Sequence, residues 1–318
     1  MSDHDYPAVF NTRSITRREL LLALGAGGLS LSLGGVSFAA PSPKPLTRTI
    51  PASGEALPVI GLGTSRVFNV GEGESERLPL RGVVKQLASS SNSVLDTSPM
   101  YGEAESVAGD MMGSLGVREG LFVATKVWTT GRGEGIAQME RSMRLLRTDR
   151  IDLMQIHNLE DWPTHLETLR AWKEQGRIRY LGITHYHEGA HESLERVMRT
   201  EPIDFVQLNY SMAEPEAAER LLPLALERGV AVIVNRPFAR GRLFRAVKGE
   251  TLPEWCTELG CRSWAQFFLK FVIAHPAVTC AIPGTSKVRH MIDNQGAGFS
   301  PLPNAGMQRR MLDLLKTV

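Results

Sequence analysis

The sequence predicts an α/β protein built as one (β/α)₈ TIM barrel, with a short hairpin before it and an extra helix after it. From about residue 55 onward, eight short apolar runs alternate with longer segments of helical period, as expected for strands buried on both faces of a parallel sheet. The first run continues as Gly61-Leu62-Gly63-Thr64, which lacks the third glycine of a Gly-x-Gly-x-x-Gly loop. This absence argues against a Rossmann-type open sheet and favours the closed barrel.

The predicted elements follow one another in strict alternation. Amphipathic segments end at glycine stops such as Gly176 and Gly229, which are typical helix terminators. Residues 47–50 and 56–58 are expected to pair as a hairpin that closes the barrel floor, and residues 307–315 to form the extra helix. The expected strands span residues 59–62, 94–97, 121–125, 151–156, 179–183, 205–208, 230–234 and 278–282, and the clearest helices 136–146, 166–175, 188–198 and 216–227.

Composition excludes several function classes. A hydrophobic content of 42% is ordinary for a soluble domain. The net charge of +2, with basic residues spread along the chain, gives no reason to expect nucleic acid as a partner. Cys256, Cys261 and Cys280 form neither a disulfide framework nor a Cys-x-x-Cys metal pair. Cys256 and Cys261 are close enough in sequence to pair in an oxidising compartment, but free thiols are favoured.

Residues 1–40 predict a twin-arginine (Tat) export signal. Arg17 and Arg18 precede an apolar stretch over residues 20–38, and Ala39 and Ala40 offer a cleavage site. A retained membrane anchor is the alternative, but five glycines lower the apolarity and helix propensity that a stable span needs. We therefore expect a bacterial protein exported through the Tat machinery, to the periplasm or beyond, without stable membrane insertion. Residues 41–54 would be a linker and the start of the hairpin, and 55–318 a single barrel domain.

Four polar side chains stand at or just after the carboxyl ends of three successive predicted strands. Asp96 ends the second strand and Tyr101 follows in its loop, while Lys126 and His157 end the third and fourth strands. Catalytic groups of such barrels sit at this rim. The four are therefore expected to meet at the barrel mouth.

The motifs around these residues resemble those of the aldo-keto reductase superfamily. The run Asp-Thr-Ser-Pro-Met-Tyr-Gly at residues 96–102 is similar to the family's Asp-Thr-Ala-x-x-Tyr-Gly signature. Thr-Lys-Val-Trp at 125–128 and Ile-His-Asn at 156–158 match the next two motifs, and the resemblance spans about residues 55 to 295. It implies an NAD(P)H-dependent enzyme that reduces aldehydes or ketones to alcohols, with the catalytic tetrad Asp96, Tyr101, Lys126 and His157.

The physical roles of the tetrad can be argued from its chemistry. A carbonyl that receives hydride develops negative charge on oxygen and needs a proton donor. A free tyrosine, with a pKa of about 10, is a poor acid, but the ammonium of Lys126 would lower the pKa of Tyr101. Asp96 can hold Lys126 in place. A neutral His157 can donate a second hydrogen bond to the substrate oxygen.

The resemblance also implies a nicotinamide cofactor, NADPH in preference to NADH. Thr184 and His185 replace the family's Ser-Asn pair, and Gln207 matches its amide-binding glutamine. Arg236 stands where many members have a tyrosine that stacks on nicotinamide. Lys287 and Arg289 are the cations expected to meet a 2′-phosphate. The residues expected to bind the cofactor are Thr64, Asp96, Thr184, His185, Gln207, Arg236, Thr285, Ser286, Lys287, His290 and Asn294.

Loop aromatics are expected to wall the substrate pocket, namely Phe68, Trp128 and Trp162. Ser65 occupies a position where many members have tryptophan, so the substrate preference of those members is not transferred. A cluster of His185, His187 and one further histidine, His191, could ligate a metal, but no carboxylate or cysteine has matching spacing. No metal is therefore predicted, and the segment is interpreted as a polar strand end leading into a helix.

Two other functions stay open at this stage. A barrel that binds NADPH with little turnover could act as a redox-sensing or partner-binding protein, and an exported enzyme has no obvious supply of fresh NADPH. A barrel hydrolase or isomerase would need paired carboxylates at strand ends, where only Asp96 is well placed. A small carbonyl compound is the expected ligand. The sequence does not determine the oligomeric state, although a monomer is expected.

Overall fold

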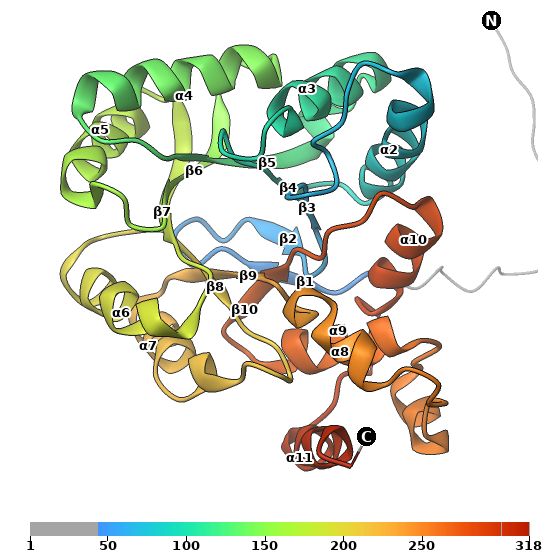
Figure 1. Cartoon of the computed structure of the whole chain (residues 1–318). Coiled ribbons are helices and arrows are strands. Elements are labelled where there is room, and N and C mark those ends of the chain that lie inside the picture. Colours follow the sequence, from blue (N-terminus) through green and yellow to red (C-terminus); the bar gives the residue numbers. More distant parts are fainter. Residues whose placement is uncertain (1–43, 300, 318) are drawn as a thin grey trace, which may run out of the picture. The chain divides into compact units, whose positions relative to one another are not determined.

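Eight parallel strands surrounded by helices form the predicted barrel (Figure 1). The computed structural model describes residues 44–299 and 301–317, so the predicted export signal at residues 1–40 lies outside the described residues. Every predicted strand is present, with ends that differ by at most three residues. The barrel strands are β3 (Leu62–Gly63), β4 (Ser93–Asp96), β5 (Leu121–Val127), β6 (Ile151–His157), β7 (Ile178–Thr184), β8 (Phe205–Asn209), β9 (Ala231–Asn235) and β10 (Val278–Ala281).

Helices follow the barrel strands and pack on their outer face (Figure 1). The predicted helix at 216–227 is divided, because Arg220 has an extended φ of −133° that interrupts it. The helices are α2 (Glu74–Leu87), α3 (Ala104–Leu115), α4 (Arg132–Leu146), α5 (Trp162–Glu174), α6 (His191–Thr200), α7 (Leu221–Arg228), α8 (Arg242–Ala246), α9 (Trp264–Ala274), α10 (Val288–Gly296) and α11 (Ala305–Leu315), with 3₁₀ turns η1 (Arg118–Gly120), η2 (Glu188–Ala190), η3 (Glu216–Ala218), η4 (Ala239–Gly241) and η5 (Glu254–Leu259).

The sheet closes on itself between its first and last strands. Its order runs from β10 to β3, and a parallel bridge joins Ile60 to Ala281. The amide of Gly61 donates to the carbonyl of Ala281 at 2.9 Å. On the other side, a Cβ on Gly61 would lie 2.6 Å from the carbonyl oxygen of Val94 in β4, so only glycine lets this segment lie so close to β4.

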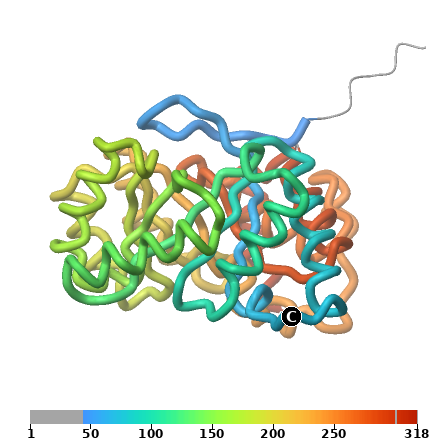
Figure 2. The backbone as a smooth tube through the Cα atoms, turned by 90° about the horizontal axis from the view of Figure 1, so that it is seen from above, coloured from blue at the N-terminus to red at the C-terminus, as the bar shows by residue number. Residues whose placement is uncertain are grey.

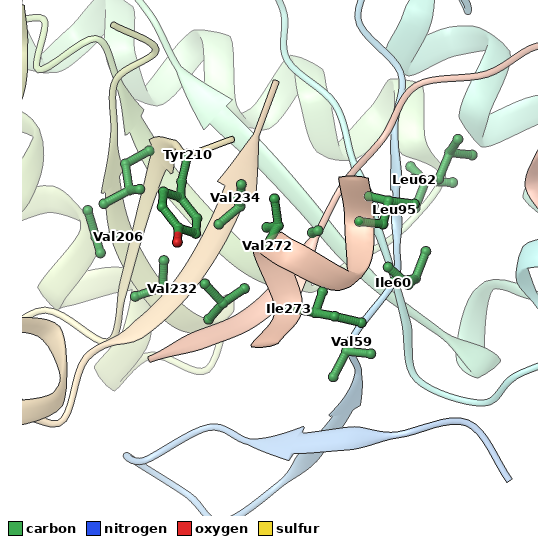
Figure 3. Close-up of a cluster of buried hydrophobic side chains, with 14 of the residues drawn as sticks. Val59, Ile60, Leu62, Leu95, Val206, Tyr210, Val232, Val234, Val272 and Ile273 are labelled. Carbon is green, nitrogen blue, oxygen red and sulfur yellow. The ribbon is translucent and has the colours of Figure 1, made fainter. Parts of the chain in front are cut away.

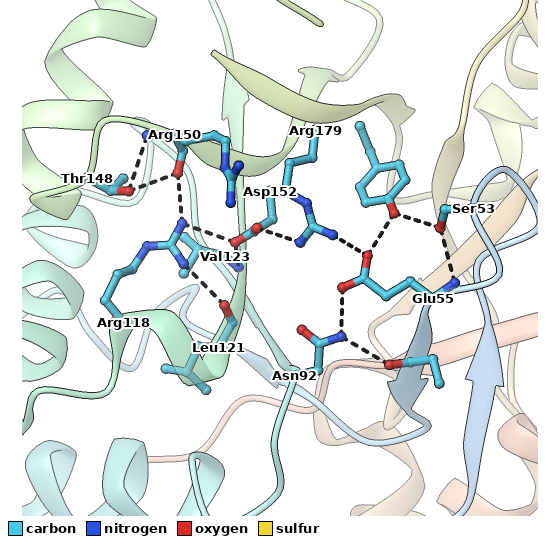
Figure 4. Close-up of polar contacts among 12 residues, drawn as sticks. Ser53, Glu55, Asn92, Arg118, Leu121, Val123, Thr148, Arg150, Asp152 and Arg179 are labelled. Carbon is cyan, nitrogen blue, oxygen red and sulfur yellow. Dashed lines mark hydrogen bonds and ion pairs between the residues drawn. The ribbon is translucent and has the colours of Figure 1, made fainter. Parts of the chain in front are cut away.

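The predicted hairpin, β1 (Thr47–Thr49) with β2 (Ala56–Pro58), covers one end of the barrel (Figure 2). Glu55 in its turn accepts hydrogen bonds from Tyr180, at 2.7 Å, and from Arg179. Arg179 also pairs with the buried Asp152 at 2.9 Å (Figure 4). This network ties the hairpin to the amino-terminal end of the barrel, opposite the carboxyl ends of the strands.

Apolar side chains fill both the barrel interior and the layer beneath the helices. Val232 of β9 and Val272 of α9 belong to the outer cluster (Figure 3). Inside the barrel, the rings of Phe122, Tyr180 and Phe205 lie with centroids 5.5 to 5.8 Å apart. The interior is therefore a packed core and not a pore, which leaves the mouth as the place for chemistry.

Two further sequence predictions concern the helix after the barrel and the cysteines. The extra helix is present as α11, and the buried Lys270 holds the segment before it by donating to the carbonyls of Pro301, at 2.9 Å, and Phe299. The three cysteines are buried free thiols. Within residues 44–299 and 301–317, no helix has the length and apolarity required for a membrane span.

Candidate active site

The centre of the site is a buried ion pair at the carboxyl ends of β4 and β5. Lys126 Nζ donates to both oxygens of Asp96, at 2.7 and 2.9 Å, and to the carbonyl of Thr97 at 2.7 Å. The amides of Gln155 and Gln207 donate to Asp96 Oδ2 at 3.2 and 2.8 Å. The Lys126 side chain has no exposed surface. All three hydrogens of the ammonium are thus used, and its position is fixed.

The electrostatics of this pair keep the ammonium charged. Burial alone would lower the pKa of Lys126, but the charges of Asp96 and Tyr101 and the hydrogen bonds to Asp96 raise it above its usual value. Lys126 is therefore a permanent cation at the barrel mouth. The predicted anchoring of Lys126 by Asp96 matches the geometry of the structure.

Tyr101 lies next to this cation. Lys126 Nζ is 5.3 Å from the centroid of the Tyr101 ring. Burial raises the pKa of Tyr101 above its usual value, and the charge of Lys126 lowers it by a smaller amount, so the net direction is upward. The sequence-based prediction that Lys126 lowers the pKa of Tyr101 below 10 is therefore wrong, because it took account of the charge of Lys126 but not of the burial of the phenol. Burial keeps Tyr101 protonated at neutral pH, and the charge of Lys126 offsets part of that effect on the pKa.

His157 ends β6 beside the phenol. Its ring meets that of Tyr101 edge to face, with centroids 5.8 Å apart, and Trp128 lies 6.4 Å away on another side. Burial, with the charges of Lys126 and His185, lowers the pKa of His157 to about 2. The imidazole is therefore neutral, as its predicted role as a hydrogen-bond donor requires.

The residues predicted to grip the nicotinamide amide are engaged with one another. Thr184 Oγ1 donates to Gln207 Oε1 at 3.2 Å, and Gln207 Nε2 donates to Asp96. In this arrangement Gln207 supports the ion pair, and Thr184 keeps an oxygen lone pair free. His185, the other residue of the replaced pair, accepts from the amide of Tyr186 at 2.9 Å through Nδ1.

Sequence reasoning missed two asparagines at the mouth. Asn158 Oδ1 and Asn235 Oδ1 are buried and accept no hydrogen bond within the described chain, and Thr64 Oγ1 is in the same situation. Thr64 and Asn158 directly follow β3 and β6, and Asn235 is the last residue of β9, so all three stand at the carboxyl ends of barrel strands. Buried polar atoms without partners are costly unless a ligand satisfies them. The left-handed φ of Asn158, 54°, would have been the signal, but it cannot be read from sequence.

Arginines gather at the same rim. The guanidinium of Arg236 stacks on the ring of Tyr186 at 4.0 Å, and that of Arg240 lies 6.0 Å from the same ring. The charge of Arg66 also acts on Arg236. Arg236 thus presents a cation and a planar surface where many family members have an aromatic ring.

The predicted adenosine-phosphate loop leads into α10. Thr285 is buried, and its hydroxyl accepts from the amide of Lys287 at 3.1 Å, which shapes the turn before the helix. Lys287, Arg289 and His290 are exposed at the helix start, where free amides and the helix dipole favour anions. Ser286 is partly buried in the same turn, and Asn294 is buried in the last turn of α10.

The three aromatics predicted to wall a substrate pocket separate in the structure. Phe68 has no exposed surface and packs in the hydrophobic core, and Trp162 begins α5 half-buried against that core. Trp128 is 41% exposed beside His157, and Met100 is 40% exposed one residue before Tyr101. Trp128 and Met100 therefore present apolar surface at the mouth.

The histidines His185, His187 and His191 next to this mouth make ring contacts and hydrogen bonds with their neighbours. The ring centroids of His185 and His187 are 4.4 Å apart, and His191 Nε2 is hydrogen-bonded to Asn209 Oδ1 at 3.1 Å. Across the described ranges, no group of three or more His, Cys, Asp or Glu residues is arranged to hold a metal ion. Burial and neighbouring charges lower the pKa of His185 to about 4.

Known proteins resemble this chain over most of its length. The sequence profile of the Aldo/keto reductase family matches residues 59–310. Methylglyoxal reductase YeaE of Escherichia coli (strain K12) is 28% identical over 268 residues, covering 81% of this chain and 90% of the relative. Glyoxal reductase of Bacillus subtilis (strain 168) is 27% identical over 251 residues, covering 76% and 83%. An aldo-keto reductase from Klebsiella pneumoniae in complex with NADPH has the same fold, with a TM-score of 0.72, 24% identity and coverage of 85% and 95%.

A barrel whose mouth holds a phenol, a buried ammonium–carboxylate pair and a neutral imidazole defines an oxidoreductase that acts on carbonyl groups. The matched profile covers well over half of the chain. This protein belongs to the Aldo/keto reductase family.

Proposed function

We propose that this protein reduces small aldehydes, with 2-oxoaldehydes such as methylglyoxal as the first candidates, using NADPH and Tyr101 as the proton donor. The observation that carries this proposal is the placement of Tyr101 against a buried cation, Lys126, and beside the neutral His157. The relatives named as methylglyoxal and glyoxal reductases suggest the substrate class.

The residues at the mouth fit a nicotinamide cofactor. The amide of a nicotinamide needs hydrogen-bond acceptors, and the unpartnered oxygens of Asn158 and Asn235 can supply them. The cations Arg236 and Arg240 suit the pyrophosphate, and Lys287 at the start of α10 suits a 2′-phosphate. These residues would hold the dinucleotide across the rim, from the adenosine loop to the ion pair.

The mechanism follows from the groups around the substrate oxygen. Bound NADPH supplies the hydride that the carbonyl carbon accepts. Tyr101 transfers its proton to the oxygen as negative charge develops there, and Lys126 stabilises the phenolate that remains. His157 orients the same oxygen through a hydrogen bond, and Trp128 shields this side of the mouth from water. Water then returns a proton to Tyr101.

Turnover separates this proposal from a barrel that only binds NADPH. Purified protein is expected to oxidise NADPH in the presence of methylglyoxal, glyoxal or another small aldehyde, which is measured as a loss of absorbance at 340 nm. Tight NADPH binding without turnover on any of a panel of aldehydes and ketones would favour the redox-sensing alternative and contradict the enzymatic one.

Lys287→Ala should weaken NADPH binding about tenfold and leave NADH binding unchanged. A cation within reach of a dianionic phosphate contributes on the order of 1.4 kcal/mol when partly exposed, which corresponds to a factor of ten. Fluorescence titration with each cofactor measures both constants. Arg262→Ala removes a cation outside these loops and serves as the control. Equal losses of NADPH and NADH affinity in Lys287→Ala would show that the 2′-phosphate is recognised elsewhere.

We also propose that the chain is exported in folded form by the twin-arginine route, to the periplasm. The support is the arginine pair Arg17-Arg18 before a glycine-rich apolar stretch that ends at Ala40. Because this route carries folded proteins, a tightly bound cofactor can travel with the enzyme. The enzyme would then not have to bind NADPH after export. Repeated turnover would still need a reductant that converts the bound NADP⁺ back to NADPH.

Replacing both arginines by lysine (Arg17→Lys with Arg18→Lys) should trap the precursor in the cytoplasm. The conservative change keeps the positive charge, so a general secretory signal would tolerate it, whereas a twin-arginine signal would not. Fractionation of cells that express the full chain measures the distribution. Export of the double variant at the normal level would exclude the twin-arginine route.

A further inference from the structure

We propose that Ser98 is a positioning residue that fixes the tautomer of His157, so that the neutral imidazole presents Nε2–H to the substrate oxygen. This inference rests on the proposed function of His157 as the second donor to that oxygen. Ser98 Oγ lies 3.0 Å from His157 Nδ1, and both side chains are buried. A buried serine hydroxyl in contact with one imidazole nitrogen determines which nitrogen carries the proton.

The direction of this hydrogen bond follows from the other contact of the hydroxyl. Ser98 Oγ accepts from the amide of Met100 at 3.3 Å. In the described chain, His157 Nδ1 is the acceptor within reach of the Ser98 hydroxyl hydrogen. If Nδ1 carried the proton, the hydroxyl hydrogen of Ser98 would be buried without an acceptor, which destabilises that tautomer. Ser98 therefore donates to Nδ1, and the single proton of the ring resides on Nε2.

The charge of the ring makes the position of that proton decisive. Burial and the charge of Lys126, with a smaller contribution from the neighbouring His185, lower the pKa of His157 and keep the ring neutral. A doubly protonated ring would donate from both nitrogens whatever its neighbours were. A neutral ring donates from one, and Nε2 makes no hydrogen bond within the part of the chain that the structure describes. Nε2–H is thus free for a ligand.

The same turn also positions the other functional groups. The carbonyl of Thr97 accepts from Lys126 at 2.7 Å, and the carbonyl of Ser98 accepts from the amide of Tyr101 at 3.0 Å. One short loop after β4 therefore sets the ammonium, the imidazole and the phenol. The signature of the family has alanine where this chain has Ser98, and alanine cannot make the bond to Nδ1.

Nitrogen NMR of the imidazole tests the proposal in the unaltered protein. In long-range ¹H–¹⁵N spectra of the NADPH-loaded enzyme, His157 should show a protonated Nε2 and an acceptor Nδ1, unchanged between pH 5 and 9. The signal is assigned by its loss in His157→Gln. A proton on Nδ1 would overturn the proposal. This measurement needs no turnover, so it stands apart from any failure of the proposed reaction.

Substitution provides the second arm. Ser98→Ala should shift the His157 tautomer toward a mixture and lower kcat about 10- to 100-fold, the range seen when a group that orients a functional histidine is lost. The KM for NADPH should stay the same, and Ser98→Thr should restore the signal and most of kcat. Ser93→Ala removes a buried hydroxyl at the opposite end of β4 and should change neither. A fall in kcat with the wild-type tautomer retained would also overturn the proposal.

Discussion

Tyr101→Phe should lower kcat for methylglyoxal about a thousandfold or more and leave NADPH affinity within twofold. General acids contribute about 10²- to 10⁴-fold to such reactions, and Tyr101 is the phenol that lies beside the Lys126 ammonium. The phenyl ring keeps the packing against His157, so the loss isolates the proton. Steady-state NADPH oxidation measures kcat, and NADPH fluorescence measures binding.

Tyr210→Phe is the matched control for this variant. Tyr210 is also a buried phenol, with burial raising its pKa to about 12, but it packs on Phe271 away from the ion pair. Its kcat should remain within twofold of the wild type. If Tyr101→Phe kept more than a tenth of the activity, another group would have to deliver the proton, and the assignment of Tyr101 would fail.

The sequence predicts the fold closely because the barrel is a repetitive pattern. Each strand is buried on both faces, so each appears as an apolar run, and all eight runs are strands in the structure. Prediction fails at strand ends. The predicted strand at 121–125 extends to Val127 as β5. The ammonium of Lys126 can be buried within this strand because the carboxylate of Asp96 takes the place of water around it. From sequence alone, a lysine predicts the end of a buried strand unless the carboxylate that pairs with it is known.

The candidate site is predictable in outline and not in its contacts. Asp96 and Lys126 are 30 residues apart, and barrel topology alone brings two neighbouring strand ends together. Topology does not show that Gln207 turns toward Asp96, nor that the loop aromatic Phe68 turns into the core. Those choices depend on side-chain rotamers and on the competition for buried hydrogen bonds.

The direction in which the pKa of Tyr101 moves could not be predicted from the sequence either. A neighbouring cation is visible in the sequence pattern, whereas the loss of solvent around a phenol requires coordinates. The structure shows that burial outweighs the charge of Lys126. Lys126 is therefore better regarded as a group that makes proton transfer possible from a buried phenol than as one that makes the phenol acidic in the resting protein.

Asp96→Asn should lower the free energy of unfolding by about 3–5 kcal/mol and abolish turnover. The substitution keeps the shape of the side chain but leaves the ammonium of Lys126, which has no exposed surface, without a counter-charge. Breaking a buried pair from one side has a cost of that size, because the remaining charge cannot reach water. Urea unfolding followed by circular dichroism measures the change.

The double variant Asp96→Asn with Lys126→Met separates charge burial from packing. Replacing both members of a buried pair by uncharged groups is often close to neutral, so most of the lost stability should return. Activity should not return, because Tyr101 then faces no cation. Asp313→Asn breaks a pair of similar length, 2.9 Å, whose side chains are more than two-thirds exposed, and should cost about 0.5 kcal/mol or less. If Asp96→Asn cost no more than Asp313→Asn, Lys126 would have to be neutral in the folded protein, and a neutral amine could not stabilise the phenolate that proton transfer leaves on Tyr101.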